Sequence, residues 1–345
     1  MKGVRPDGYT TQYKPKRSGG TRRIDIPSES ILAEQRRILR RYLSLLQPSP
    51  FAHGFVKGRS PVTAAIPHVG KRVVMRIDIR DFFNSITFEN WRKTLGWLFR
   101  FDADMHRSLC TAHSSSWGSY RGRCLDWFFD HVERYCFIQV EPDAPELAVD
   151  PPPTPPGVFP ATIPVPTRAA PKAKTILPQG FATSPALANL YLRRFDWSIA
   201  RMAFVRYNAN YTRYADDLIF SGPAVEGREF KPLPAIISRV RRRLAVLDLE
   251  VNEKKIVVMR RPQQQKVLGL VVNDKPGPSR SYRKNLRAAL YQVRRGRVMD
   301  DTLRGELAYI QGVEKQKSEP VMTYYHYEVL RRAAGEPSLV AVKRV

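Results

Sequence analysis

One stretch of the chain decides its fold: Tyr211-Thr-Arg-Tyr-Ala-Asp-Asp-Leu-Ile-Phe-Ser-Gly222. The residues on both sides of the acidic pair, Asp216 and Asp217, favour β-strands. Two short strands joined by a polar pair are typical of a β-hairpin, so we expect both carboxylates at its tip. Aspartate is also common in ordinary hairpin loops, and simple turn chemistry stays open as an alternative for this pair alone.

A further acidic position favours a catalytic interpretation of the hairpin. The mostly apolar residues 73–79 predict a strand that delivers Asp78 near its end. Carboxylates at the ends of strands can hold two divalent cations for phosphoryl transfer. We therefore expect Asp78, Asp216 and Asp217 to form one acidic site.

The composition suits a folded protein that binds a polyanion. The chain has 345 residues, of which 43% are hydrophobic, and this length predicts about two or three domains or subdomains with a real core. Its formal net charge of +26 makes nucleic acid the leading class of partner. A charge that serves only solubility is the weaker alternative, because arginine and lysine cluster beside apolar faces.

The sequence lacks the usual marks of a secreted or membrane protein. No apolar run approaches the ~20 residues needed to cross a membrane, and the polar start, Met1-Lys-Gly-Val-Arg5, lacks a signal-peptide segment. The three cysteines argue against a disulfide framework. A zinc site at Cys110 and His113 would lack two clear ligand pairs, so ordinary semi-buried cysteines are the favoured interpretation. We expect a cytoplasmic protein.

Helical and irregular stretches alternate along the rest of the chain. Residues 1–20 predict a loose basic arm, residues 31–46 an amphipathic helix, and residues 90–138 an aromatic, helical region. The proline-rich residues 141–171 predict a surface insertion or linker that serves as a spacer. Beyond residue 276, two basic helices with apolar backs suit a surface that follows a nucleic-acid backbone, with a solvated basic face as the alternative.

Several polar groups are candidates for contacts with phosphate or sugar. Gln179 and Gly180 form a turn before a helix that Ser184 caps, and their backbone N–H groups are free to meet a ligand. Arg22 and Arg23 could grip phosphates, and so could Lys255; a solvated position is the alternative for each.

Two phenylalanines follow the first acidic strand, in the stretch Asp78-Ile-Arg-Asp-Phe-Phe-Asn-Ser-Ile86. We expect one ring to pack in the core and the other to floor a nucleotide pocket. Core packing of both rings is the alternative, and it is stronger for Phe82 than for Phe83.

In their order and spacing, several motifs of the chain resemble those of the reverse transcriptases, and among them the bacterial retron type, over roughly residues 20–315 without the proline-rich segment 141–171. The acidic stretch that begins at Asp78 is similar to the first palm motif, Leu177-Pro-Gln-Gly-Phe-Ala-Thr-Ser-Pro185 to the second, and Tyr214-Ala-Asp-Asp217 to the third. Asn252-Glu-Lys-Lys255 and Leu268-Gly-Leu270 resemble a later palm motif and the primer-grip hairpin.

The resemblance implies an α+β right-hand polymerase fold with fingers, a palm made of a small antiparallel sheet packed on helices, and a helical thumb. Residues 1–72 would form the N-terminal arm and fingers, and residues 73–100 the first part of the palm. Residues 101–175 would form a fingers and palm helical region that includes the insertion 141–171. Residues 176–275 would complete the palm, and residues 276–345 would form a basic thumb.

The resemblance also implies roles for the candidate residues. Asp78, Asp216 and Asp217, with the backbone of Ile79, would bind two Mg²⁺ ions, for which Mn²⁺ can substitute, and would catalyse nucleotidyl transfer. Phe83 is similar in position to the aromatic residue that excludes a 2′-hydroxyl. Further contacts to the incoming nucleotide are expected from Arg22, Arg23, Asp81, Phe82, Gln179, Gly180 and Lys255. Contacts to nucleic acid are expected from Arg283, Lys284, Arg287, Arg294 and Arg295.

Within the family, His53-Gly-Phe55 and His68 are retron-like, although Ala64 stands where a retron enzyme typically has asparagine. A retron enzyme would be an RNA-directed DNA polymerase that uses dNTPs. It would copy part of a dedicated structured noncoding RNA, which is both template and primer, into a branched RNA–DNA product (msDNA). A separate toxic effector protein and a role in antiphage defence often accompany such systems. The alternatives are a reverse transcriptase of another bacterial defence or group II intron-related class, and a non-catalytic basic RNA-binding protein.

Overall fold

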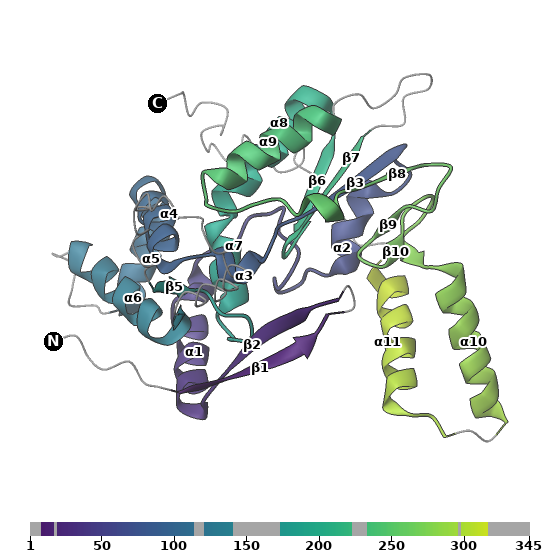
Figure 1. Cartoon of the computed structure of the whole chain (residues 1–345), viewed down its shortest axis with the longest axis horizontal. Coiled ribbons are helices and arrows are strands. Elements are labelled where there is room, and N and C mark those ends of the chain that lie inside the picture. Colours follow the sequence, from purple (N-terminus) through teal and green to yellow (C-terminus); the bar gives the residue numbers. More distant parts are fainter. Residues whose placement is uncertain are drawn as a thin grey trace, which may run out of the picture.

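The computed structural model describes residues 8–16, 19–113, 121–140, 173–222, 233–295 and 298–316, and the proline-rich residues 141–171 lie outside these ranges. Helices and small antiparallel sheets are mixed along the chain (Figure 1), as the α+β prediction requires. None of the helices within the described ranges combines the length and apolar character that crossing a membrane requires.

A four-stranded antiparallel sheet carries the predicted acidic hairpin. Its strand order is β6 (Asn210–Tyr214), β7 (Asp217–Gly222), β3 (Val73–Asp78) and β8 (Val257–Arg260). The central strands β7 and β3 are buried along nearly their whole length, so both of their faces are covered. This burial explains why their sequences form apolar runs instead of alternating patterns.

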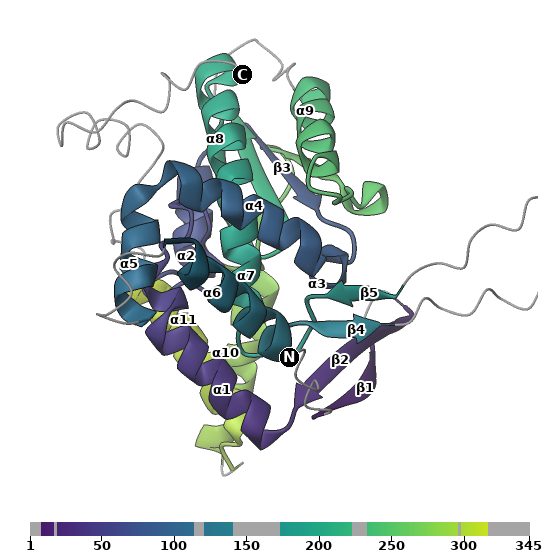
Figure 2. The ribbon, with the colours of Figure 1, turned by 90° about the vertical axis from the view of Figure 1, so that its left-hand side faces the viewer.

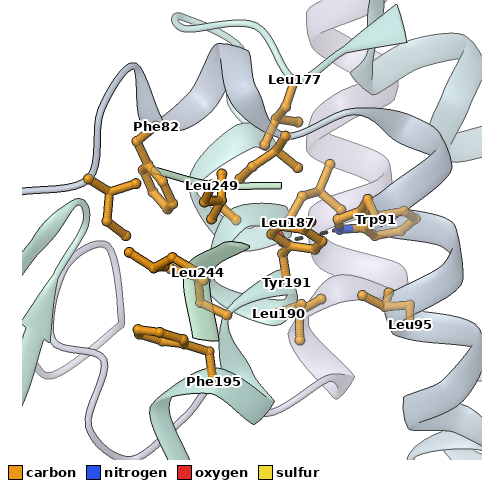
Figure 3. Close-up of a cluster of buried hydrophobic side chains, with 14 of the residues drawn as sticks. Phe82, Trp91, Leu95, Leu177, Leu187, Leu190, Tyr191, Phe195, Leu244 and Leu249 are labelled. Carbon is orange, nitrogen blue, oxygen red and sulfur yellow. Dashed lines mark hydrogen bonds between the residues drawn. The ribbon is translucent and has the colours of Figure 1, made fainter. Parts of the chain in front are cut away.

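Helices carry the main hydrophobic core against this sheet. They are α7 (Ser184–Tyr191), α8 (Arg193–Tyr207), α9 (Leu233–Ala245) and α4 (Phe88–Phe101). Leu187, Phe195 and Leu244 meet in this core (Figure 3). Trp91 is fully buried, and its indole Nε1 donates a 3.1 Å hydrogen bond to Leu187 O. Because apolar burial stabilises by about 25 cal/mol per Å², these contacts hold the helices against the sheet.

The region expected to be the fingers combines a hairpin with helices. Its elements are β1 (Tyr9–Pro15), β2 (Thr21–Pro27), α1 (Glu29–Arg41), η1 (Leu43–Leu45), α5 (Ala103–His113), α6 (Arg121–Cys136), β4 (Ile138–Val140) and β5 (Lys174–Ile176). The β4–β5 pair and the β1–β2 hairpin lie at the same end of the molecule (Figure 2), and Tyr9 and Ile176 meet in a small apolar cluster between them.

Two local predictions for this region need correction. Residues 9–15, expected in a loose arm, pair with β2 along their whole length and so form a strand. The helix predicted for residues 31–46 ends at Arg41, because Tyr42 is its C-cap and a 3₁₀ turn follows. The helical prediction for residues 90–138 is confirmed for the described part, as α4, α5 and α6.

The C-terminal described region consists of short strands followed by two helices. The elements are β9 (Lys266–Val267), β10 (Leu270–Val271), β11 (Gly277–Pro278), α10 (Arg280–Arg294) and α11 (Asp301–Gln316). Ser279 caps α10 by accepting a hydrogen bond from Tyr282 N. Val313 of α11 packs in a small cluster with Val62, Ile219 and Val267, where Val62 belongs to α2 (Pro61–Ala65). This cluster joins the two helices to the sheet.

His68 connects the segment before β3 to the acidic hairpin. It lies in η2 (Ile66–His68), is fully buried, and has Nδ1 2.7 Å from Ser221 Oγ and Nε2 2.8 Å from Thr212 Oγ1. Thr212 Oγ1 donates its proton to Ala64 O over 3.0 Å, so it accepts from His68 Nε2. Burial lowers the pKa of this imidazole to about 3, so the ring is neutral, with Nε2 donating to Thr212 and Nδ1 accepting from Ser221.

We expect His68 to make the fold sensitive to acid. The folded-state pKa of about 3 lies below the ordinary value of 6.5, so a falling pH protonates the unfolded chain first. The stability is complete above the ordinary value and is lost as the pH falls below it, by about 2 kcal/mol at pH 5 for this one group. Urea denaturation at pH 7 and pH 5 should show a smaller loss for His68→Gln. An equal loss in both proteins would contradict the assignment, while His53, whose pKa burial also lowers to about 3, should leave the variant partly acid-sensitive.

Candidate active site

The three predicted acids lie at the same end of the four-stranded sheet. Asp78 ends β3 and is the register partner of Asp217, the first residue of β7. Directly opposed residues in an antiparallel pair have Cα atoms about 4.5–5.5 Å apart. Asp216 is tied to the same place, because its carbonyl accepts a 3.0 Å hydrogen bond from Ile79 N. The structure therefore brings the three acids together at neighbouring backbone positions.

Burial and mutual repulsion disfavour the ionised form of these acids. Burial raises the pKa of Asp217 to about 6, and the charges of Asp216 and Asp78 add to the rise, while Arg76 and Lys255 oppose it. Burial likewise raises the pKa of Asp216, with Asp78 adding to the rise and Arg22 among the groups that oppose it. A bound divalent cation would relieve both effects by supplying positive charge where the carboxylates face each other.

Two cationic side chains of the chain itself partly neutralise the acids. Lys255 Nζ lies 3.1 Å from Asp78 Oδ2, and Arg76 Nε lies 3.6 Å from Asp217 Oδ1. Lys255 belongs to η3 (Glu253–Lys255), and its side chain is half exposed. Across the described ranges, no three His, Cys, Asp or Glu side chains are already grouped as a metal site. The donor chemistry still fits a hard cation, because Mg²⁺ prefers carboxylate oxygens and long cationic side chains can withdraw from them.

A buried ion pair supports the hairpin from beneath. Arg213 of β6 is fully buried, and its Nε and Nη2 donate to the two carboxylate oxygens of Asp196 on α8, each over 2.8 Å. Its Nη1 donates to Asn189 Oδ1 over 3.0 Å and to Ala215 O over 3.1 Å. Ala215 has a left-handed φ of +54°, which is uncommon for a residue other than glycine. Arg213 therefore fixes the turn residue that precedes the acidic pair.

The sequence analysis missed this supporting network. The one signal in the sequence was a charged residue, Arg213, within a predicted strand, and the structure buries its neighbours Tyr211 and Thr212 as well. A charge at such a position requires a buried partner. The partner, Asp196, lies on a helix 17 residues earlier in the chain, and only the packing of α8 against β6 brings it into contact.

The β1–β2 hairpin, expected to belong to the fingers, contacts the loop that contains Gln179 and Gly180. Asp25 N donates a 2.8 Å hydrogen bond to Gln179 O. Gly180 has a φ of +121°, and a Cβ at this position would lie 2.4 Å from Asp25 O, so only glycine fits. The two predicted phosphate contacts differ here: Arg22 adds positive charge near Asp216, whereas Arg23 Nε is held 2.9 Å from Asp25 Oδ1.

The residues after Asp78 divide between surface and core. Asp81, with a left-handed φ of +40°, is exposed and lies 3.9 Å from Lys16 Nζ at the fingers hairpin. Phe82 begins α3 (Phe82–Ser85) and is only 5% exposed within the main core. This burial leaves its ring almost no surface for a nucleotide and corrects the expected nucleotide contact of Phe82. Phe83 is half-buried, with its ring centroid 5.2 Å from that of Phe82.

The predicted nucleic-acid contacts on α10 form an exposed basic face. Arg283, Lys284, Arg287 and Arg295 are all exposed, whereas Leu286 is buried on the other side of the helix; the side chain of Arg294 lies outside the described ones.

Two of the three cysteines, Cys124 and Cys136, are buried on α6, and burial raises the pKa of each thiol to about 12. A buried thiol whose pKa is raised is poorly reactive.

Comparison with known proteins shows which protein family part of the chain resembles. Residues 164–272 match the family model described as reverse transcriptase (RNA-dependent DNA polymerase), and the matched segment includes the acidic hairpin and the Gln179 loop. The matched segment is thus similar to a reverse transcriptase domain, and the predicted α+β right-hand fold is confirmed.

Several curated relatives of the chain are reverse transcriptases of the retron type. The chain is 34% identical over 314 residues to the retron Mx65 reverse transcriptase of Myxococcus xanthus, covering 90% of this chain and 62% of that protein. It is 30% identical to the retron Mx162 reverse transcriptase of the same organism, covering 84% of this chain and 53% of that protein. It is 28% identical to the retron Ec86 reverse transcriptase of Escherichia coli, covering 92% and 79%. These matches confirm the resemblance to the bacterial retron type, although the chain spans less than two thirds of the two Myxococcus proteins.

We expect the Arg213–Asp196 pair to be strongly coupled. Arg213→Met leaves the Asp196 carboxylate buried without its partner, which should lower the free energy of unfolding by about 3–5 kcal/mol. The double variant Arg213→Met, Asp196→Leu removes both charges and should recover about 2 kcal/mol or more, measured by urea denaturation. Additive losses in the double variant would show that the two side chains do not depend on each other.

Proposed function

We propose that this chain is an RNA-directed DNA polymerase of a retron. The observation that supports this best is the meeting of Asp78, Asp216 and Asp217 at one end of two neighbouring strands. In a chain with a net charge of +26, three mutually repelling carboxylates at the centre would weaken a protein that only held a polyanion. Catalysis through bound divalent cations explains why these carboxylates lie together, and this favours a catalytic function over a non-catalytic RNA-binding function.

We propose that Asp78, Asp216 and Asp217, with the carbonyl of Ile79, hold two Mg²⁺ ions, for which Mn²⁺ can substitute. When bound, the ions supply activation of the primer hydroxyl and neutralisation of the leaving pyrophosphate. Without them, Lys255 balances the charge of Asp78 over 3.1 Å. Once Asp78 has another counter-charge, the half-exposed Lys255 side chain is released and can turn toward the phosphates of the incoming dNTP.

The proposed nucleotide pocket lies between the fingers hairpin and the acids. Arg22 adds positive charge beside Asp216 and is placed to meet a triphosphate. Gln179 and Gly180 would line the pocket, because β2 holds their loop in position. Phe83, next to Asp81, would exclude the 2′-hydroxyl and so select dNTPs over ribonucleotides.

The nucleic-acid partner is proposed from the basic helix α10 and from the relatives. The exposed arginine and lysine side chains of α10 suit contacts to the backbone of a structured RNA. The similar proteins are named retron reverse transcriptases. We infer that this chain copies a dedicated noncoding RNA, used as template and primer, into msDNA in the cytoplasm, with an effector protein as partner in antiphage defence.

We expect Asp217→Asn to abolish synthesis without harming the fold. The purified protein should extend a primer on an RNA template only when Mg²⁺ is present, and the variant should show no extension while it still binds the RNA.

The same variant tests the charge at the site through its stability. Because the pKa of Asp217 is raised to about 6, its ionised form opposes folding above that pH, and the amide should raise the melting temperature in metal-free buffer. Added Mg²⁺ should then stabilise the wild type more than the variant. Asp274→Asn, at an exposed carboxylate outside the site, is the matched control. Normal extension by Asp217→Asn would overturn the metal assignment.

The retron assignment has its own test. RNA and DNA that co-purify with the protein from its native host should contain a branched molecule in which a 2′-hydroxyl of the RNA is joined to the DNA. Sequencing before and after treatment with a debranching enzyme detects this linkage. Linear complementary DNA alone would leave a polymerase of another bacterial class and reject the retron.

A further inference from the structure

The helices α8 and α9 carry a dense group of arginines. Each helix contains four arginines and no lysine, and the one acid within them, Asp196, is buried. The two helices contact each other, and in both views they lie at the end of the molecule away from α10 and α11 (Figures 1 and 2). This group is therefore separate from the basic face of α10.

Five of these arginines lie close to one another. They are Arg194 and Arg206 of α8 and Arg239, Arg242 and Arg243 of α9, and together they are called the α8–α9 arginine surface. All are exposed except Arg239, which is half-buried. None of the five forms an ion pair with a carboxylate in the part of the chain that the structure describes. Their charges can therefore meet an anionic partner.

The five charges repel one another. The pKa of Arg239 is lowered, first by burial and then by the charges of Arg243, Arg242 and Arg206. The pKa of Arg194 is lowered by burial and by the charge of Arg243. Arg239 and Arg243 are also four residues apart, a spacing at which like charges destabilise a helix. The cluster thus lowers the stability of the fold, and a bound polyanion would remove the repulsion. A face that is only solvated would gain nothing from such a cluster.

The arginines form two rows, and one of them is held by an aromatic ring. The guanidinium carbon of Arg194 lies 3.2 Å from the ring centroid of Trp97 on α4. Arg194, near the start of α8, is repelled by Arg243, near the end of α9, whereas Arg206, near the end of α8, repels Arg239, which comes earlier in α9. The helices therefore run antiparallel, with their axes about 8–10 Å apart. Two such rows can contact both strands of a nucleic-acid stem.

The α8–α9 arginine surface lies on the reverse side of the sheet from the acids. Met75 and Ile77 of β3 belong to the main core, to which α8 and α9 also contribute. Val74 belongs to the cluster that contains Val313 of α11. Because side chains alternate along a strand, Asp78 is on the side of Val74, away from α8 and α9. A nucleic acid seated at the acids can therefore reach this surface only with a further segment that passes around the protein.

We propose that the α8–α9 arginine surface binds a folded RNA segment that lies outside the site of chemistry. Guanidinium groups pair with phosphate oxygens, and their planes also stack on the unpaired bases of RNA loops. A folded RNA presents both features, whereas a DNA duplex presents phosphates without unpaired bases and an acidic protein presents neither. The choice of RNA rests on the proposed function, while binding by this surface does not require the acids to be catalytic.

The double variant Arg239→Gln, Arg243→Gln separates this role from a role in folding. It removes two like charges, so the melting temperature should be unchanged or higher. The probe is a fluorescent RNA hairpin with a stem of about 16 base pairs, added to protein that a short primer–template already saturates. Measured by anisotropy, the Kd for the hairpin should rise about tenfold, and its dependence on salt should weaken by about two phosphate contacts. Arg241→Gln is the matched control, because Arg241 is exposed on the same helix but already pairs with Glu253 over 2.7 Å. Its Kd should stay within about twofold of the wild type.

Other polyanions identify the occupant of the surface. A DNA hairpin of the same sequence should bind the wild type more weakly than the RNA hairpin, and poly-glutamate should not displace the RNA. Equal binding of the DNA hairpin, or displacement by poly-glutamate, would reject RNA as the occupant. An unchanged Kd in the double variant, an equal rise in the control, or a fall in the melting temperature of the double variant would overturn the proposal.

Extension of a short primer on an unstructured RNA template keeps the two proposed functions apart. The wild type, the double variant and the control should all extend it at the same rate, because the arginine surface lies away from the acids. Failure of the wild type to extend any primer would overturn the polymerase function and leave the result with the RNA hairpin standing.

Discussion

The buried ion pair between Arg213 and Asp196 is the interaction on which the position of the acidic hairpin depends. Removing a guanidinium and a carboxylate from water costs several kcal/mol for each ion, and only good geometry offsets that cost. Here the pair is bidentate, and Tyr211 Oη and Asn189 complete its hydrogen bonds. The network links α7 and α8 to the hairpin. Since a one-residue slip of β6 would turn Arg213 away from Asp196, the pair also specifies the register.

The candidate active site contains unfavourable interactions that the Arg213 network has to offset. Burial raises the pKa of Asp216 and Asp217, so at neutral pH their ionised forms oppose folding. The hairpin turn adds a left-handed residue, Ala215, whose carbonyl Arg213 holds. Strained and mutually repelling groups persist only where the surrounding structure fixes them. Lys255 and Arg76 reduce the repulsion from the solvent side, and the Arg213 network holds the backbone from the core side.

Local sequence patterns were enough to predict the acids but not the groups that hold them. Asp78 and Asp217 could be placed because each ends or begins a strand with a clear apolar pattern, and Asp216 because it lies in the turn directly before Asp217. Arg213 could not be paired in advance, since its partner lies on a helix and only tertiary packing brings the two together. The sequence also favoured core packing more for Phe82 than for Phe83, but it could not show the left-handed Asp81 that turns the chain into α3 and buries Phe82. The strand β1 was missed because its polar residues pair with β2 while staying exposed.

One short segment connects the C-terminal helix α11 to the hairpin. α11 contacts α2 through Val313, and Gln316 accepts a hydrogen bond from Ser60, the N-cap of α2. The loop that contains Gly54, where a Cβ would lie 2.6 Å from Ala215 N, runs directly into that cap. Residues 49–68 therefore touch α11, the hairpin and, through His68, two strands of the sheet. A retron-like signature at His53 and His68 then has a structural reason that does not depend on any direct contact with RNA.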